Sequence, residues 1–359
     1  MYDLHVVGAG PAGLFAAYTA LKSGYCPIVS EEHKSAGSPV HCSGLVSASG
    51  LEQLSDVVDY KKIKLNTINR ANLHGKNKSF SLSYKMPKAY LISRDGFDEQ
   101  AAQKYICEGG KINFSHKVRD VSDLLSKNVI GADGPISTVS HIFNFSKISS
   151  YTACWQAEFD YACEDSHSVD VFFNPDMVPG FISWIIPIDE YRAKIGLGVA
   201  SDTTLQSAKR KFLQNLSLPL HGDNEFSALI PIRARSKTAK TQNGYNVCLC
   251  GDSAGQVKST SGGGIFFGSQ CGRIAAKNFE NPNRYESQWR SKYGLDLSLH
   301  SYLRQGLDIL SSDGIDLWMS GIKFAKIDKL LMQIGEMDEY SKMLNFRLIS
   351  AWAKSFRGN

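Results

Sequence analysis

The chain has 359 residues, of which 43% are hydrophobic and 21% are charged, and its formal net charge is +5. This is the composition of an ordinary soluble globular protein, long enough for a large core and two closely joined domains. The Lys and Arg residues form no long block, which argues against nucleic-acid binding, and no apolar run is long enough to cross a membrane.

The first residues predict a strand, a glycine turn, a helix and a second strand. A hydrophobic run at 4–7 is followed by the glycine turn at 8–13, a helical pattern at 14–21 and a second apolar run at 25–30. Glu31 stands directly after that run. A GxGxxG turn in this setting is typical of dinucleotide-binding proteins. Because a strand begins at once, we expect no targeting segment and a cytoplasmic location.

Each residue type in the turn suits a dinucleotide. Gly8 makes the tight turn, Gly10 lets the backbone approach a pyrophosphate, and Gly13 lets the helix pack close to the strand. The unpaired N–H groups and the positive dipole end of the helix favour phosphate. Glu31 can accept hydrogen bonds from the two hydroxyls of a ribose. We therefore expect the pyrophosphate in front of the helix and the ribose beside Glu31.

The following segments predict further elements of the same domain. Residues 36–60 form an irregular Gly/Ser-rich loop that leads to a short helix. A strand is expected at 89–92, a helix at 95–108 and a strand at 111–118, before another short strand at 127–132.

The pattern then changes to that of an antiparallel sheet. Apolar and polar residues alternate in four runs, at 152–159, 168–173, 180–187 and 193–199. A buried strand at 245–250 returns to the first domain, and from Pro282 to Phe356 the apolar spacing is helical. We predict a discontinuous dinucleotide-binding domain (1–150 and 236–282), an inserted sheet domain (151–235) and a helical C-terminal region (283–359), with 75–92 assigned to either of the first two.

Acidic turns follow two of the buried strands. Asp133 and Asp252 each stand at the carboxyl end of such a strand, where parallel sheets place their ligand crevice. There Asp252 can accept a ribityl hydroxyl, while the amides of Gly263, Gly264 and Ile265 can hydrogen-bond the pyrimidine ring of a flavin. Taken alone, each motif could also be a loop that contains glycine only because its turn geometry requires it. Together and in this order, they favour a flavin dinucleotide.

The chain resembles the FAD-dependent oxidoreductases of the hydroxybenzoate-hydroxylase type and, within them, the geranylgeranyl reductase family. The resemblance covers almost the whole chain. Residues 37–45, GSPVHCSGL, are similar to the family's cysteine-containing loop beside the flavin. Residues 179–187, PGFISWIIP, followed by AKIGLG at 193–198, are similar to its substrate-cavity motif. The resemblance implies an α/β fold: a Rossmann-type FAD-binding domain with an inserted antiparallel β-sheet substrate domain and a helical C-terminal tail.

The resemblance also implies roles for individual residues. It assigns contacts with FAD to residues of the glycine turn, the cysteine loop and the later motifs: Gly8, Gly10, Ala12, Gly13, Glu31, His41, Cys42, Gly44, Arg94, Val118, Asp133, Asp252, Gly263, Gly264 and Ile265. It assigns Phe181, Trp184 and Pro187 to the substrate cavity. No metal site is expected, because the eight cysteines form no CxxC pair and no group with zinc spacing.

The aromatic motif also has an interpretation from residue types alone. Phe181 and Trp184 are three residues apart, so an undistorted strand would point them to opposite faces and at least one could line a cavity. Packing of both rings in the core of the sheet is the alternative. Pro187 cannot donate to a ladder and should mark a sheet edge or the end of its strand.

Cys42 is the candidate catalytic residue. A lone cysteine is most often a small buried apolar group, but the Gly/Ser-rich loop around Cys42 argues against simple packing. Beside a flavin its thiol could donate a proton or position the substrate. His41 is a second candidate proton source, although simple exposure explains it better.

The resemblance implies an FAD-dependent reductase that saturates C=C double bonds of the geranylgeranyl chains of membrane lipids, with hydride delivered from reduced flavin. Two alternatives stay open: an aromatic hydroxylase or related monooxygenase of the same fold, and a non-catalytic flavin- or prenyl-binding protein. NAD(P)H, ferredoxin and another low-potential donor all stay open as the external reductant, because no second dinucleotide motif is present.

The expected partners are the isoprenoid lipid and an electron donor. The C-terminal region, which interleaves apolar residues with Lys323, Lys326 and Lys329, is expected to cover the inserted sheet. Peripheral contact with the inner membrane face is the alternative for this region, and it would suit a lipid substrate.

Overall fold

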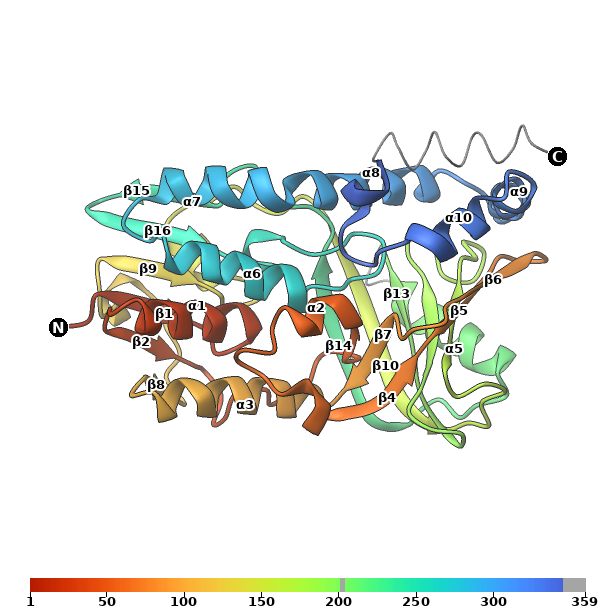
Figure 1. The fold of residues 1–359 in the computed structure, drawn as a ribbon, viewed down its shortest axis with the longest axis horizontal. Coiled ribbons are helices and arrows are strands. Elements are labelled where there is room, and N and C mark those ends of the chain that lie inside the picture. The colour runs from red at the N-terminus through yellow and green to blue at the C-terminus, as the bar shows by residue number, and fades with distance from the viewer. Residues whose placement is uncertain (201–203, 345–359) are drawn as a thin grey trace.

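A computed structural model describes residues 1–200 and 204–344 of the chain. Figure 1 shows a parallel sheet with helices around it at the N-terminal end of the molecule and a second sheet beside it, with the last helices lying across both. The predicted α/β fold with a second, mostly antiparallel sheet and a helical C-terminal region is confirmed. The helical expectation for 345–359 lies outside the described residues.

The parallel sheet has the strand order β15-β16-β9-β1-β2-β8. Every neighbouring pair is parallel except β15 and β16, which form an antiparallel pair at one edge. Its strands are β1 (Leu4–Val7), β2 (Pro27–Ser30), β8 (Lys111–Asn113), β9 (Asn128–Gly131), β15 (Ala239–Gln242) and β16 (Tyr245–Leu249). The inner strands β1 and β2 are buried along their whole length, as expected for a sheet covered on both faces.

Helices from distant parts of the chain cover one face of this sheet. They are α1 (Pro11–Lys22), α3 (Arg94–Cys107) and α6 (Ile265–Ala276), and α1 packs against both of the others. Leu4 and Val6 of β1 point into their core, whereas Val7 points to the opposite face. There α4 (Thr138–Ile142) contributes Val139. The strand-to-helix turns at the carboxyl ends of β1, β9 and β16 therefore meet at one edge.

The second sheet has the strand order β14-β10-β13-β12-β11-β5-β6 and is antiparallel except for the pair β11 and β5. Its strands are β5 (Arg70–His74), β6 (Ser79–Ser83), β10 (Tyr151–Asp160), β11 (Ser168–Phe172), β12 (Ser183–Pro187), β13 (Arg192–Val199) and β14 (Asp223–Pro231). Residues 70–83 therefore complete this sheet. In contrast, β7 (Ala89–Ile92) pairs with β3 (Leu45–Ser47) and β4 (Lys64–Ile68) in a small separate sheet.

The two faces of the second sheet have different neighbours. The outer face, which includes Trp155, Ile195 and Leu197, packs against α5 (Leu205–Asn215). The inner face carries Gln156, Trp184, Lys194, Gly196 and Gly198, which alternate with the outer residues along their strands. This inner face contacts the parallel-sheet part of the molecule. Lys194 donates a hydrogen bond to the Ser43 carbonyl oxygen, and the ring centre of His41 lies 5.9 Å from that of Phe226.

The C-terminal helices pack on both sheets. They are α7 (Pro282–Trp289), α8 (Leu295–Asp308), α9 (Ser312–Phe324) and α10 (Ile327–Ile334), and α2 (Ala48–Glu52) is a short helix beneath them. α7 contacts β15 and β16, whereas α9 and α10 contact β6. Phe80 of β6 shares a small apolar core with Ile315 and Met319 of α9. In the described part of the chain, no helix is long and apolar enough to cross a membrane.

Two strands are shorter than the alternation predicts. The expected strand at 180–187 begins only at Ser183, because Gly180 has a φ of +79° and turns the chain before it. The expected strand at 111–118 ends at Asn113, since Ser115 has a φ of +55°. Phe181 and Val118 therefore lie in connecting segments.

Candidate cofactor and substrate site

The glycine turn after β1 has the geometry that its residue types predict. A Cβ at Gly8 would lie 2.4 Å from the Ala132 carbonyl oxygen, and one at Gly13 would lie 1.9 Å from the Gly8 oxygen. A Cβ at Gly10 would meet nothing within 4 Å. Two glycines thus permit close packing, whereas the third leaves open space in front of the α1 N-terminus. This space fits the pyrophosphate of FAD.

Ala12 and Gly13 hold α1 in place. A Cβ at Gly272 in α6 would lie 2.2 Å from the Ala12 carbonyl oxygen, so the two helices touch at their backbones. Ala12 is itself buried. Ala12 therefore serves the packing between α1 and α6.

Glu31 is buried and faces the glycine turn. Its Oε2 accepts a 2.8 Å hydrogen bond from the Ala9 N–H. Its Oε1 accepts one from the His33 N–H at 2.9 Å and lies 2.7 Å from His33 Nδ1. A carboxylate has about four lone-pair sites, so acceptor capacity remains for ribose hydroxyls. His33, which sequence reasoning missed, orients the carboxylate; its only sequence signal is its closeness to Glu31.

Arg94 begins α3 and is buried against Asp98. The two side chains form an ion pair one helical turn apart, and they are 13% and 3% exposed. Arg94 also interacts electrostatically with Cys42 and Asp252. The structure thus brings together three predicted site residues from separate segments. Asp98 was given no role from sequence; burial raises its pKa to about 6, against the attraction of Arg94.

The two acidic turns lie at the carboxyl ends of β9 and β16. Asp133 Oδ2 accepts a 2.9 Å hydrogen bond from the Val139 N–H, whereas its buried Oδ1 has no hydrogen-bond partner among the described residues. Burial raises the pKa of Asp133, and raises that of Asp252 to about 6. A buried acceptor without a partner is a place where a polar ligand fits.

The glycine turn at 262–264 lies beside Asp252. A Cβ at Gly264 would be 3.1 Å from Asp252 Oδ1, and a Cβ at Gly263 would be 2.5 Å from Lys258 Cε. Ile265 begins α6 directly after the turn. The backbone here therefore lies close to the Asp252 turn.

The cysteine loop lies between Arg94 and the inner face. Cys42 is half-buried and His41 is exposed. The Gly44 N–H points to Cys42 Sγ at 3.4 Å, and Gly44 itself has a φ of +81°. Lys194, which sequence reasoning did not single out, donates from Nζ to the Ser43 carbonyl oxygen at 2.9 Å.

Phe181 and Trp184 lie on the same face of the second sheet. Their rings cover two glycines of β13: a Cβ at Gly196 would be 2.6 Å from the Trp184 ring, and one at Gly198 would be 2.6 Å from Phe181. An undistorted strand would have separated them, but β12 begins after Phe181, so the alternation does not apply. Trp184 Nε1 donates to Gln156 Oε1 at 3.0 Å. No sequence motif pointed to Gln156 as a site residue.

Pro187 and Val118 lie away from these rings. Pro187 ends β12 opposite Ala193, which belongs to the outer-face core. Since β12 is an interior strand, Pro187 marks a strand end and not a sheet edge. Val118 is buried with Val7 and Val129 in the core of the parallel sheet. The structure therefore does not bring Pro187 to the Trp184 face, and Val118 offers a cofactor only its backbone.

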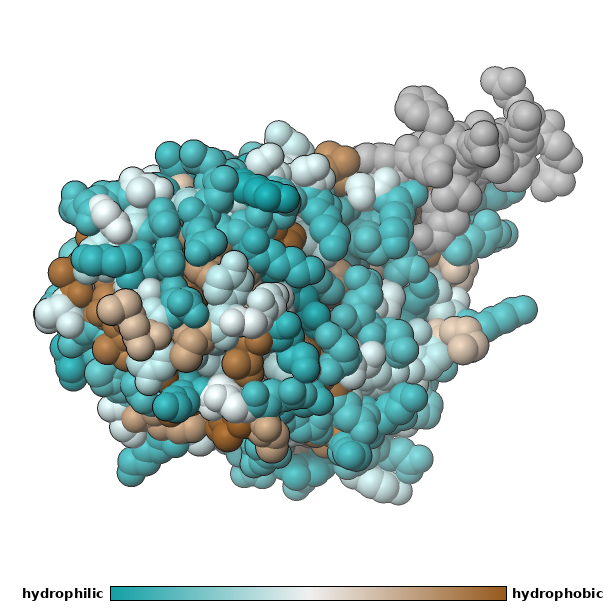
Figure 2. Space-filling view, turned by 60° about the vertical axis from the view of Figure 1, so that its left-hand side comes forward, coloured by the Kyte–Doolittle hydropathy of each residue, from teal (hydrophilic) through white to brown (hydrophobic). Residues whose placement is uncertain are grey.

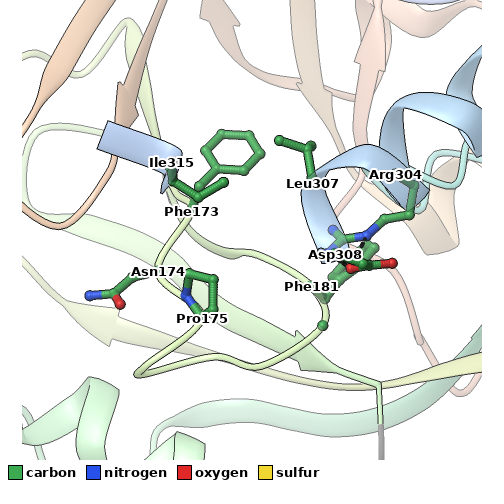
Figure 3. A pocket seen from close by; sticks show the side chains of 9 residues that line it. Phe173, Asn174, Pro175, Phe181, Arg304, Leu307, Asp308 and Ile315 are labelled. Carbon is green, nitrogen blue, oxygen red and sulfur yellow. Dashed lines mark hydrogen bonds and ion pairs between the residues drawn. The ribbon is translucent and has the colours of Figure 1, made fainter. Parts of the chain in front are cut away.

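A small pocket lies on the far side of Phe181, between the 173–181 segment and helices α8 and α9 (Figure 3). It is lined by Phe173, Asn174, Pro175, Gly180, Phe181, Arg304, Leu307, Asp308 and Ile315. Its volume is about 20 Å³, which is room for about one water molecule. Arg304 pairs with Asp308, and its guanidinium lies 5.3 Å from the centre of the Phe181 ring. Phe181 thus separates this pocket from the inner face.

Among the described residues, no group of three or more His, Cys, Asp or Glu side chains could hold a metal ion. The face of the molecule in Figure 2 is mostly hydrophilic, with small groups of apolar side chains between the polar ones. Such scattered apolar groups are ordinary on a protein surface.

Comparison with known proteins agrees with this geometry. A family profile described as "FAD binding domain" matches residues 3–73. An uncharacterized protein of Methanocaldococcus jannaschii is 26% identical over 95% of this chain and 93% of its own. Digeranylgeranylglycerophospholipid reductase 2 of Methanothermobacter thermautotrophicus is 24% identical over 96% of this chain and 98% of its own.

The fold has a close counterpart among solved structures. A geranylgeranyl bacteriochlorophyll reductase-like protein from Thermoplasma acidophilum superposes with a TM-score of 0.75, at 20% identity, over 97% of this chain and 96% of its own. At that identity, the likeness establishes the fold alone. The matched FAD domain and the full-length relatives lead to one conclusion: the protein is an FAD-dependent oxidoreductase related to the digeranylgeranylglycerophospholipid reductases.

Proposed function

We propose that the protein saturates C=C double bonds in the isoprenoid chains of membrane lipids. The observation that carries the proposal is the inner face, where Phe181 and Trp184 lie on the glycines of β13 and where Lys194 contacts Ser43, next to Cys42. An apolar surface beside a flavin-binding site suits a hydrocarbon substrate. The name of the Methanothermobacter relative points to the same substrate class.

FAD supplies the hydride in such a reduction, so the chain itself must bind, orient and exclude water. We assign the pyrophosphate to the open space at Gly10, the ribose to Glu31 and the ribityl chain to Asp252. The amides of Gly263, Gly264 and Ile265 are assigned to the flavin pyrimidine ring. Arg94 contributes a positive charge between Cys42 and Asp252.

Cys42 is the proposed proton donor, from its Sγ–H to the second alkene carbon. It is half-buried, and its neighbours include the cations Arg94 and Lys194. His41 is exposed and is therefore proposed only as a route for the returning proton.

The isoprenoid chain is assigned to the inner face. Trp184 is fixed there by its hydrogen bond to Gln156, so its ring offers a rigid apolar wall. Ile186 on the same strand and Ile230 on β14 extend that wall. The pocket behind Phe181 is too small for a prenyl chain, so we assign the substrate to the Trp184 side instead.

A lipid substrate also requires access from a membrane. Exposed apolar side chains on or beside α8 and α9 support peripheral contact: Tyr302, Leu303, Ile309, Leu317 and Phe324. The electron donor is proposed to visit transiently, as NAD(P)H, ferredoxin or another low-potential donor.

The proposal is tested by anaerobic incubation of dithionite-reduced holoprotein with digeranylgeranylglycerophospholipid, followed by mass spectrometry. We expect products that have gained two hydrogen atoms for each double bond saturated. Oxidised holoprotein is the control. Unchanged substrate mass would overturn the proposal. Substrate-dependent oxygen consumption would instead favour a monooxygenase, and a flavin that no donor reduces would favour a binding protein.

A further inference from the structure

We propose that the corner between α9 and α10 is a docking surface for an anionic lipid bilayer. This docking surface consists of Leu317 and Phe324 on α9, together with Lys323, Lys326 and Lys329. The inference deepens the proposed function, because it names the surface through which an enzyme that reduces lipids would reach its substrate. Its evidence involves neither the cofactor nor the cysteine loop.

The helix α9 is apolar on two opposite sides. Ile315, Met319 and Ile322 point into a small core and are at most 7% exposed, whereas Leu317 and Phe324 are 75% and 87% exposed. The two exposed residues are seven positions apart, so they share one side of the helix, opposite the buried residues. A helix packed on a protein normally carries polar residues on its outward side. Packing on β6 therefore explains only one of the two apolar sides.

Three lysines stand close to Phe324 in the chain. Lys323 lies in the last turn of α9, Lys326 between the helices and Lys329 in the first turn of α10, and all three are exposed. The half-buried Asp328 is the one acid between Leu317 and Lys329 in the sequence. An exposed aromatic ring among lysines is typical of helices that bind the surface of anionic membranes.

The turn between β5 and β6 brings a further cation to the docking surface. The backbone N–H groups of Asn77 and Lys78 donate to the Asp316 carboxylate at 2.9 Å and 3.2 Å, and Lys78 is exposed. Asp313 and Asp316 are the acids of α9, and both stand before Leu317. The positive charge is therefore concentrated at the Phe324 end of the helix.

The docking surface lies at one end of the sheet face that we assign to the substrate. Strand register forms one row across that face: Trp184 pairs with Val171, Val171 with Leu73, and Leu73 with Phe80. Phe80 packs against the buried side of α9. In Figure 1, α9 and α10 lie at the end of the molecule opposite the N-terminus. A bilayer on the outward side of α9 would thus lie at the end of an apolar row that leads to Trp184.

A second copy of the chain fits the docking surface less well. In a two-fold dimer the same surface meets itself, so each lysine would lie near lysines of the other copy. Like charges across an interface are costly. Two protruding side chains also bury far less than the roughly 1,200 Å² of a stable protein interface.

The chain after Leu344 also fits less well as the occupant. Its sequence contains three cations, Arg347, Lys354 and Arg357, and no Asp or Glu. It would therefore add positive charge to a surface that is already positive. Anionic headgroups attract the lysines, while the acyl region beneath them accepts Leu317 and Phe324.

Co-sedimentation of the full-length holoprotein with vesicles tests the proposal. The vesicles contain phosphatidylcholine alone or an equal mixture with phosphatidylglycerol, and neither lipid carries an isoprenoid chain. We expect binding to the anionic vesicles that weakens as salt is added, because salt screens the lysines. Binding to the neutral vesicles should be weaker by about tenfold or more.

Two double variants separate the apolar and the charged contributions. Leu317→Ser combined with Phe324→Ser should weaken binding to anionic vesicles by about tenfold or more, since these side chains no longer gain from burial in the bilayer. Lys323→Gln combined with Lys329→Gln should weaken it about tenfold at low salt and have little effect at high salt.

The matched controls lie on other parts of the molecule. Tyr191→Ser removes an aromatic side chain that is 72% exposed in the turn between β12 and β13. Lys147→Gln combined with Lys237→Gln removes two exposed lysines beside the parallel sheet, next to the bonded hydroxyls of Ser146 and Ser236. These variants should bind anionic vesicles within about twofold of the unmodified protein.

No binding to anionic vesicles would overturn the proposal, as would equal losses in the test and control variants. Light scattering of the Leu317→Ser, Phe324→Ser variant examines the second copy as occupant: a change from dimer to monomer would assign the surface to it. A lower unfolding temperature of the same variant, with vesicle binding unchanged, would assign the surface to the chain after Leu344.

The vesicle readout does not depend on lipid reduction, so it separates the two proposals. A protein that binds these vesicles through α9 but reduces no isoprenoid lipid would retain the docking surface and remove the proposed reaction. A protein that reduces detergent-dispersed lipid but binds no vesicles would do the opposite.

Discussion

Glu31 and Asp252 are the carboxylates that we assign to the ribose and the ribityl chain of FAD, but their surroundings differ. Glu31 accepts hydrogen bonds from the Ala9 and His33 backbone. Asp252 lies at the end of β16. Burial raises its pKa to about 6, although the positive charge of Arg94 acts in the opposite direction. The fold thus provides hydrogen bonds to Glu31, whereas the ionised form of Asp252 lowers the stability of the folded protein.

Replacing Glu31 by Gln should weaken FAD binding about tenfold. An amide cannot accept from the Ala9 N–H, the His33 N–H and the ribose together, and one lost acceptor costs about 1–3 kcal/mol. FAD affinity is measured by flavin fluorescence on titration of the apoprotein. Glu32→Gln is the matched control, because Glu32 is exposed and pairs with Lys117 at the surface. Equal affinities for the two variants would contradict the role of Glu31.

Asp252→Asn should change how the stability of the apoprotein depends on pH. The folded-state pKa of about 6 lies above the ordinary value of 3.8, so the folded protein binds more protons between these values. The free energy of unfolding therefore falls as pH rises from about 4 to about 6, by about 3 kcal/mol. Because Asn cannot ionise, the free energy of unfolding of Asp252→Asn lacks this dependence on pH.

Urea unfolding of both proteins across this range checks the prediction. The stability of Asp252→Asn relative to the unmodified apoprotein should increase with pH up to about 6 and then stay constant. Parallel curves would show that Asp252 titrates normally. The variant should also bind FAD more weakly, since a carboxylate accepts from a hydroxyl more strongly than an amide does.

At the scale of the element, β13 is shaped by its two glycines. They remove side chains from the inner face where the rings of Phe181 and Trp184 lie. Neighbouring residues of the same strand, such as Ile195 and Leu197, fill the outer-face core. One strand thus packs tightly on one side and leaves room for aromatic rings on the other.

Gly198→Ala should destabilise the protein by about 1–3 kcal/mol. The new Cβ would lie 2.6 Å from Phe181 and 2.7 Å from Cys154 Sγ, so both neighbours would have to move. Chemical denaturation measures the effect. Gly306→Ala in α8 is the control, because a Cβ there meets nothing within 4 Å, and Ala is the better helix former by about 1 kcal/mol. A neutral Gly198→Ala would mean that the inner face is open at this point.

At the scale of the whole molecule, the C-terminal segment returns to the cofactor site. Asp338 Oδ1 pairs with Lys258 Nζ at 2.7 Å, and its other oxygen accepts from the Ser47 hydroxyl. Lys258 contacts the glycine turn that we assign to the flavin. The pair is almost fully buried, at 8% and 5% side-chain exposure. The segment after α10, a helix that contacts β6, therefore connects the second sheet to the turn that we assign to the flavin.

Asp338→Ala should destabilise the protein by about 3–5 kcal/mol, because it leaves the Lys258 ammonium buried without its partner. Thermal unfolding of the holoprotein measures this, and faster release of FAD should accompany it. Glu339→Ala is the adjacent control: its pair with Lys342 is largely exposed and contributes at most about 1 kcal/mol. Equal losses of stability in the two variants would contradict a specific role for the buried pair of Asp338 and Lys258.

Local patterns were enough to predict much of this protein. The glycine turn, Glu31, the two Asp turns and the alternating runs each depend on residues close in sequence, and the structure places them in the predicted elements. The fold class follows from the order of those elements. The bounds of β8 and β12 were less predictable, since Ser115 and Gly180 adopt positive φ values that alternation does not reveal.

By itself, the sequence determined the dinucleotide-binding unit, the two-sheet fold and the cysteine loop, because short-range spacing decides which residues share a turn or a face. Only the tertiary structure decided that Phe181 and Trp184 share the inner face, that Lys194 holds Ser43, and that Asp338 holds Lys258. These contacts join segments far apart in the chain or depend on where a strand begins. They are set by strand register and by the packing of one sheet on another, which no local pattern encodes.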